Sequence, residues 1–178
     1  MSELSPLTPP SPLGGEGKGE GKTNYFFFFL AAGFGAGYSP IAPGTAGTLV
    51  AIPIYFFLSF IPFPLYELTI ITFFFLSSWI SERAQKEWGK RDHPRIVIDE
   101  MMGFFITMLW LPKTILFIIL GFFLFRFFDI VKPPPIRFLE RVKGGYGVVL
   151  DDVLAGVYAN IILQFVRLFI KSSLSPLY

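Results

Sequence analysis

Apolar residues form five long blocks along the chain, separated by short breaks that are rich in proline, glycine and charge. The blocks lie at about 47–61, 65–81, 100–111, 114–128 and 153–170. Charged residues inside the blocks are few and lie near their ends. Because backbone polar groups in lipid must be hydrogen-bonded within their own segment, such blocks predict helices. The pattern therefore predicts an all-α, polytopic membrane helical bundle.

Several of these blocks are shorter than the ~20 residues that a perpendicular membrane span requires. We therefore expect some helices to be short, tilted, broken or shallow. The breaks IPFP (61–64) and LPK (111–113) predict tight turns, since proline disfavours helical geometry in the residue before it. Each turn would join two helices into a hairpin.

The N-terminal part of the chain has a different composition. Residues 1–24 consist largely of Pro, Gly, Ser and Glu and predict a disordered tail, which leaves 25–178 as a single membrane-embedded domain. The block YFFFFLAA (25–32) is too short to span a bilayer, and the sequence leaves open whether it enters one. Five glycines and two prolines within residues 33–47 predict a loop there.

Composition supports an integral membrane protein and limits its chemistry. The chain is 53% apolar, 19% aromatic and 16% charged, and it contains no cysteine, which excludes disulfides, thiolate zinc sites and cysteine nucleophiles. Its net charge of +2 gives no reason to expect a nucleic-acid partner.

The distribution of charge predicts an orientation. If the tail, the loop at 82–99 and the loop at 126–147 share one side, that side holds twelve of the fifteen basic residues. The positive-inside rule makes it the cytoplasmic side. This predicts a multi-pass protein of the cell inner membrane with these loops in the cytoplasm.

Carboxylates occur on that same side at three places where a polar loop meets an apolar block. The residues are Asp99, Glu100, Asp129, Asp151 and Asp152. Ionised acids at such a depth are costly unless they are paired or bind a cation, so they are functional candidates.

Local roles compete with a functional one. Asp99 and Glu100 could interact with a helix dipole, and one of Asp151 and Asp152 could cap a helix. Asp129 could form an exposed ion pair with Lys132 or Arg126. The coincidence of five acids on one face favours a divalent cation instead. Oxygen ligands favour magnesium or manganese over zinc, and magnesium often contacts a substrate phosphate as well.

Basic and hydroxyl side chains near these acids could bind the phosphate. Lys132 precedes three prolines and could face a phosphoryl oxygen, or simply extend to the membrane interface. Arg126 could clamp a phosphate or pair with an acid. The segment APGTAGT (42–48) contains Thr45, Thr48 and a helix start, which form either an anion site or a simple turn.

Four ordered motifs then resemble those of the phosphatidylglycerophosphatase A family. They are GYSPIAPGTAGT, DHPRIVIDEMMG, FRFFDIVKPPPI and GGYGVVLDDVLAG, which together extend over most of 35–165. The resemblance implies a membrane enzyme that hydrolyses the phosphomonoester of phosphatidylglycerophosphate and requires Mg²⁺. It also implies that the motif carboxylates fall on Asp99, Glu100, Asp129, Asp151 and Asp152, and the motif lysine on Lys132.

The residue inventory narrows the mechanism independently. Without cysteine, with one histidine and with no DxD pair, the chain lacks the nucleophiles of the common phosphatase classes, which leaves metal-activated water. The site we predict has catalytic and metal-binding acids, and phosphate-binding groups at Thr45, Arg126 and Lys132. Alternatives are a CDP-alcohol-type phospholipid transferase, whose DGxxAR pattern is absent, and a small cation transporter. The oligomeric state is left open.

Overall fold

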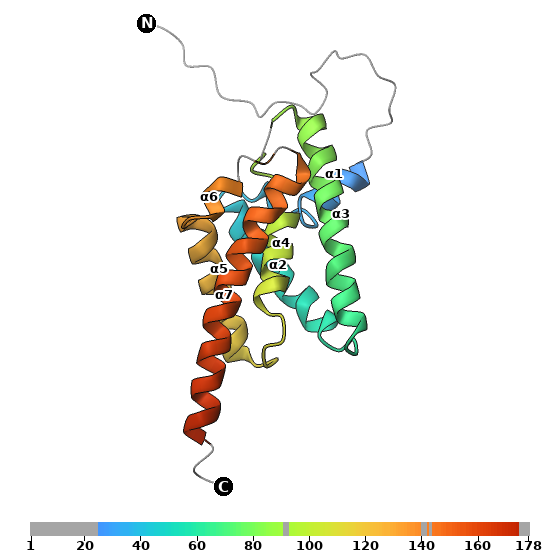
Figure 1. Ribbon diagram of the computed structural model, residues 1–178. Coiled ribbons are helices and arrows are strands. Elements are labelled where there is room, and N and C mark those ends of the chain that lie inside the picture. Colours follow the sequence, from blue (N-terminus) through green and yellow to red (C-terminus); the bar gives the residue numbers. More distant parts are fainter. Residues whose placement is uncertain (1–24, 91–92, 140–141, 143, 175–178) are drawn as a thin grey trace, which may run out of the picture.

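The computed structural model describes residues 25–90, 93–139, 142 and 144–174, and every regular element in them is helical (Figure 1). The all-α prediction is confirmed for this part of the chain, whereas the predicted disordered tail lies outside it. In chain order the elements are α1 (Tyr25–Ala31), the 3-10 helix η1 (Ala36–Tyr38), α2 (Pro43–Leu58), α3 (Leu65–Trp88), α4 (Ile98–Thr107), α5 (Ile115–Val131), α6 (Ile136–Leu139) and α7 (Gly145–Leu174).

Helix α4 forms the centre of the molecule. It contacts α2, α3, α5 and α7, and eight of its ten residues are buried. Phe104 and Phe105 are among the largest fully buried side chains. At 1.5 Å per residue α4 is about 15 Å long, roughly half the thickness of a bilayer's hydrocarbon core. It is therefore one of the short helices that the block lengths predicted.

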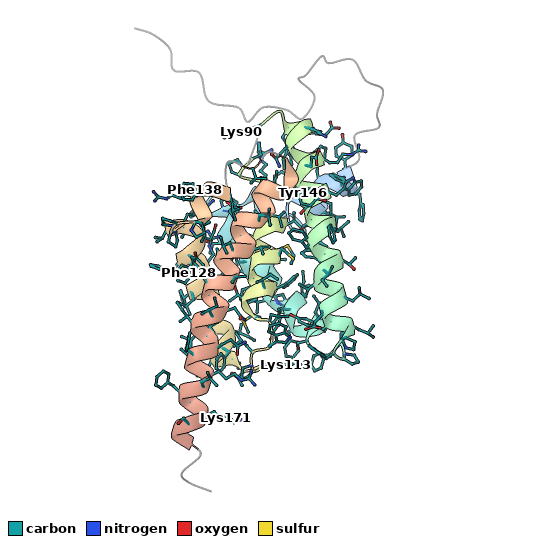
Figure 2. All side chains as sticks on the ribbon, in the orientation of Figure 1. Lys90, Lys113, Phe128, Phe138, Tyr146 and Lys171 are labelled. Carbon is teal, nitrogen blue, oxygen red and sulfur yellow. The ribbon has the colours of Figure 1, made fainter. Side chains whose placement is uncertain are left out.

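The two predicted turns are confirmed, because α2 ends at Leu58 and α3 begins at Leu65, while α4 ends at Thr107 and α5 begins at Ile115. Both turns lie at the lower end of the molecule in Figure 1, together with the end of α7. The end of α3, helix α6 and the start of α7 lie at the opposite end. Lys90 marks that upper end in Figure 2, and Lys113 and Lys171 mark the lower one.

Helix α2 begins earlier than the sequence predicted. Residues 43–47 were expected to be in a loop, but Pro43 occupies the first turn, where its missing N–H is not required. Gly47 in the next turn is buried directly against Val97, where the Cβ of any larger residue would overlap. The glycines thus permit close packing of a helix rather than breaking it.

Helix α7 also begins earlier, at Gly145 rather than near Val153. The expectation that Asp151 or Asp152 caps this helix is therefore wrong, because both lie inside it. The helix can begin at Gly145 since this residue packs directly against the Ser78 carbonyl of α3, where a Cβ would not fit.

Helices α4 and α7 cross at two glycines. A Cβ on Gly156 would overlap the Gly103 carbonyl oxygen, and a Cβ on Gly103 would meet Phe125 and the Asp152 carbonyl oxygen. Ala155 and Ala159 on the same part of α7 are fully buried. Small residues let the two backbones approach closely.

Three polar side chains of α7 satisfy backbone carbonyls at the end of α4 and in the connection that follows it. Asn160 Nδ2 donates to Thr107 O (2.9 Å) and Leu109 O (2.8 Å). Gln164 Nε2 donates to Leu109 O at 3.2 Å, and Arg167 Nη1 donates to Trp110 O at 2.7 Å. The terminal carbonyls of a helix have no partner within it, so these side chains replace water there.

Among the described residues, the stretch Gly145–Ser172 of α7 is the one helix both long and apolar enough to cross a bilayer. Helix α2 is apolar but shorter. Many large apolar side chains of the other helices are exposed, including Phe57, Phe123 and Ile115, which are 72%, 65% and 76% exposed. An apolar outer surface of this kind is typical of a protein surrounded by lipid.

Candidate active site

Three carboxylates from two helices meet at the upper end of the bundle. Asp99 and Glu100 lie in the first turn of α4, and Asp152 lies in α7 beside the α4–α7 crossing. Each offers an oxygen atom, and these atoms all lie within 4.8 Å of one another. Asp99 and Asp152 are 3% and 5% exposed, and Glu100 Oε2 is buried with no hydrogen-bond partner. Buried like charges at this spacing repel each other unless a cation or protons neutralise them.

Asp129 extends this cluster from the end of α5. Its carboxyl group lies beside Asp152, within hydrogen-bonding reach. It also pairs with Arg126 of the preceding turn, since Arg126 Nη1 lies 2.5 Å from Asp129 Oδ2. Both side chains are largely buried, at 14% and 13% exposed. The sequence allowed an exposed ion pair between Asp129 and Arg126. The pair is present, but it is largely buried rather than exposed.

Two nitrogen atoms of Arg126 have no hydrogen-bond acceptor even though the side chain contacts Asp129. Its Nε and Nη1 atoms are buried without a hydrogen-bond acceptor, because the contact with Asp129 is close but poorly directed. An unpaired buried guanidinium N–H carries the full cost of its desolvation. Such a group is suited to an anionic ligand with oxygen acceptors, and planar Arg binds phosphate well.

The start of α2 completes this part of the site. A Cβ on Gly44 would overlap Glu100 Oε1 and lie 3.0 Å from Arg126 Nη1, so both side chains rest directly against this glycine. The first amides of a helix lack intrahelical acceptors and favour anions. Sequence reasoning found the helix start but missed Gly44, for which the signal was a glycine directly after the proline that begins α2.

Lys132 is joined to the cluster through Asp151. Its Nζ donates to Asp151 Oδ2 at 2.7 Å, and its backbone is left-handed, with φ 45°. Asp151 is 6% exposed and also accepts the Asp152 N–H through Oδ1 at 3.1 Å. Asp151 thus joins Lys132 to the acidic cluster, and the lysine is not simply extended into the membrane interface.

The remaining candidates differ in position. Thr45 is half-buried in the first turn of α2, next to Gly44. Thr48 is fully buried and donates its hydroxyl to Gly44 O at 2.9 Å, so its proton is used within the helix. His93 lies outside the cluster against Trp88, where burial and the nearby Arg95 and Lys90 lower its pKa.

The site therefore combines a group of buried acids with two cationic side chains and a helix N-terminus. Carboxylates in this number are hard oxygen ligands for a divalent cation, whereas Arg126, Lys132 and the start of α2 favour an anion. A phosphate bound beside a cation would satisfy both sets. This combination of charges is compatible with phosphoryl chemistry.

Comparison with known proteins decides the family. The family model described as Phosphatidylglycerophosphatase A matches residues 29–167. The chain belongs to the phosphatidylglycerophosphatase A family. The matched range contains every side chain of the site, from Thr45 to Asp152.

Relatives of this phosphatidylglycerophosphatase A family member extend over most of its length. The Phosphatidylglycerophosphatase A of Escherichia coli K12 is 42% identical over 139 residues, which cover 77% of this chain and 81% of the relative. The Phosphatidylglycerophosphatase A of Haemophilus influenzae is 38% identical, with 75% and 84% covered. A candidate phosphatidylinositol-3-phosphatase of Bacteroides thetaiotaomicron is 43% identical, with 78% and 91% covered. No solved structure matches the chain.

Proposed function

We propose that this protein is a membrane lipid phosphatase that hydrolyses the phosphomonoester of phosphatidylglycerophosphate to phosphatidylglycerol and phosphate. Membership of the family and the names of two relatives support the substrate. The observation that carries the proposal is the buried Arg126 beside a cluster of buried carboxylates, because Arg126 Nε and Nη1 and Glu100 Oε2 have no hydrogen-bond partner. A phosphate and its cation would supply partners for these atoms.

We further propose that Mg²⁺ is held by Asp99, Glu100 and Asp152, with Asp129 beside them. The donor set fits, because the oxygen atoms are close together and Glu100 Oε2 has no other partner. Mg²⁺ bound there would supply charge neutralisation and favour deprotonation of an attacking water. Asp151 acts through Lys132 and keeps its ammonium group in place.

The chain's own residues have separate tasks in this reaction. Arg126, Thr45 and the start of α2 bind the phosphoryl oxygens, and Lys132 supplies a second positive charge to them. A cluster carboxylate accepts a proton from the water as its oxygen bonds to phosphorus. The bond from phosphorus to the glycerol oxygen breaks, and that oxygen takes a proton to become the hydroxyl of phosphatidylglycerol.

The proposed membrane placement follows from the shape and charge of the bundle. We place the protein in the cell inner membrane as a multi-pass protein, with the acidic cluster near the cytoplasmic interface. Described basic residues at the cluster end include Arg83, Lys86, Lys90, Arg95 and Arg137, whereas Lys113, Arg167 and Lys171 belong to the other end. The substrate then reaches the site with its acyl chains in lipid and its phosphate at the surface.

A second candidate concerns the head group rather than the reaction. The Bacteroides relative named as a candidate phosphatidylinositol-3-phosphatase covers as much of this chain as the Escherichia coli relative does. The same phosphate site could therefore serve an inositol phosphate head group. Both candidates use one constellation of residues and differ in what surrounds the leaving oxygen.

One assay separates these functions. Phosphate release would be measured with phosphatidylglycerophosphate, phosphatidylinositol 3-phosphate, phosphatidic acid and soluble glycerol phosphate, each with Mg²⁺ and with chelator. We expect Mg²⁺-dependent and preferential hydrolysis of phosphatidylglycerophosphate. Preference for the inositol lipid would establish the second candidate. No release from any of them would return attention to a head-group transferase or a cation transporter.

A further inference from the structure

A cavity lies at the end of the molecule opposite the acidic cluster. Its volume is about 310 Å³, and it is bordered by the end of α2, the α2–α3 turn, the start of α3 and the α4–α5 connection. Gly44 and Ser59 lie fifteen residues apart at and just beyond the two ends of α2, a separation of about 22 Å along the helix. The cavity is therefore distinct from the proposed active site.

Polar side chains that border the cavity include Tyr66 and Lys113. The hydroxyl of Tyr66 is buried and has no hydrogen-bond partner. Lys113 borders the same space and donates from Nζ to the Ser59 carbonyl oxygen, which uses one of its three N–H groups. A buried hydroxyl without a partner is costly, and an acceptor inside the cavity would remove that cost.

The rim of the cavity is apolar and exposed. Phe60 and Phe63 are 68% and 66% exposed, and Trp110, which also borders the cavity, is 58% exposed. Aromatic residues of this kind gather where a membrane meets water. A ligand that enters here therefore brings an apolar part along the rim and a polar part toward Lys113.

Charge selects the polar part. An aromatic cavity can attract a quaternary ammonium, but the ammonium group of Lys113 at its edge opposes a second cation. Glu67, an acidic residue next to the rim, already accepts a hydrogen bond from Trp110 Nε1 at 2.9 Å. Arg167 adds a further positive charge against the Trp110 carbonyl. The cavity is thus complementary to an anionic head group.

We propose that this cavity binds one molecule of an anionic glycerophospholipid from the leaflet opposite the active site. Lys113 and the Tyr66 hydroxyl contact the lipid phosphate, and the aromatic rim packs against the upper part of its chains. The proposal rests on the multi-pass placement given above but not on the chemistry of the acidic cluster. It assigns the lower end of the bundle a lipid-binding role of its own.

Native mass spectrometry of the full-length protein in detergent tests the proposal. Purified protein would be mixed with equal amounts of a phosphatidylglycerol and a phosphatidylcholine of matched acyl chains, and the retained lipid counted. All retention measurements use an Arg126→Gln background, which removes a phosphate-binding side chain of the proposed active site and so weakens lipid binding there. In this background we expect preferential retention of one phosphatidylglycerol, reduced about tenfold by Lys113→Gln.

Matched variants make the result specific. Lys171→Gln removes the same charge at the same end but outside the cavity, and it should leave retention unchanged. Lys113→Arg should preserve most of it. Tyr66→Phe removes the unpaired hydroxyl, so it should weaken retention without lowering the melting temperature.

Three results would overturn the proposal. They are equal retention of the two lipids, equal loss in Lys113→Gln and Lys171→Gln, or full displacement of the lipid by soluble glycerol phosphate or inorganic phosphate. Phosphate release by the Lys113 variants would be measured in the wild-type background. Loss of lipid retention with hydrolysis intact supports the cavity alone, whereas absent hydrolysis with lipid retained contradicts only the proposed function.

Discussion

At the scale of single residues, the acidic cluster conflicts with folding. Asp99 and Asp152 are almost fully buried, and each faces other carboxylates. A group of acids in this setting destabilises the chain unless a cation binds, so its presence indicates a role that outweighs its cost. Stability and activity should therefore respond in opposite directions when one acid is neutralised.

Replacement of Asp152 by Asn tests this conflict. Phosphate release should fall by at least about 100-fold, the effect typical of disturbing even the outer partners of a metal site. Without Mg²⁺ the variant should melt a few degrees higher, because one repelling charge is gone and 1 kcal/mol shifts a chain of this size by about 2–4 °C. Mg²⁺ should raise the melting temperature of the wild type but not of the variant.

Asp129→Asn should lose activity in the same assay, and Glu67→Gln, at the other end of the bundle, serves as the control. Full activity in both Asp129→Asn and Asp152→Asn would overturn the proposed site. A thermal shift by Mg²⁺ that persists unchanged in Asp152→Asn would remove this residue from the metal ligands.

Gly44 is a second residue whose size decides the geometry. In Gly44→Ala the new methyl group meets Glu100 Oε1 and Arg126 Nη1, so both functional side chains must move. A displacement of about 1 Å can reduce a rate by about 100-fold, and we expect a loss of that order in phosphate release. Gly121→Ala is a matched control, because its methyl group first meets the flexible Met108 side chain. Equal activity in the two variants would contradict this assignment.

At the scale of helices, the sequence revealed the blocks and turns but not where two helices begin. Prolines at 62 and 112 mark the hairpin turns correctly, because a turn is a local property of the chain. The early starts at Pro43 and Gly145 depend on contacts with Val97 and Ser78, which are distant in sequence. Single-sequence patterns do not contain such contacts.

The same distinction applies to the site. Five acids on one side of a membrane protein suggested a cation, and three of them do gather within 4.8 Å. The pairing of Lys132 with Asp151, rather than with its neighbour Asp129, could not be predicted. It depends on how α5 and α7 pack against each other.

The crossing of α4 and α7 carries its own prediction. Gly156→Ala places a methyl group against the Gly103 carbonyl, which is backbone and cannot rotate away. Overpacking of this kind costs about 1–3 kcal/mol. Because Asp152 lies one turn earlier in α7, phosphate release should fall as well. Melting temperature and activity would be measured beside Ile161→Ala, a change at an exposed position of the same helix. An unperturbed Gly156→Ala would show that the contact is not tight.

At the scale of the whole molecule, the absence of cysteine provides a direct test of orientation. Single-cysteine variants Lys90→Cys and Lys171→Cys mark the two ends of the bundle. A membrane-impermeant maleimide should label Lys171→Cys in intact cells with the outer membrane opened, and Lys90→Cys only in inverted vesicles. Labelling of both from the same side would contradict the proposed multi-pass placement.

The link between α7 and the end of α4 bears on how the protein is made. The last carbonyl of α4 and those of the residues just after it accept hydrogen bonds from Asn160, Gln164 and Arg167, which leave the ribosome about fifty residues after them. Until then these oxygens need water or a chaperone, so α4 cannot settle at its final depth during synthesis of the preceding helices. The last helix to be translated thus completes the burial of the middle one, and chains that stop before it should be degraded rather than assembled.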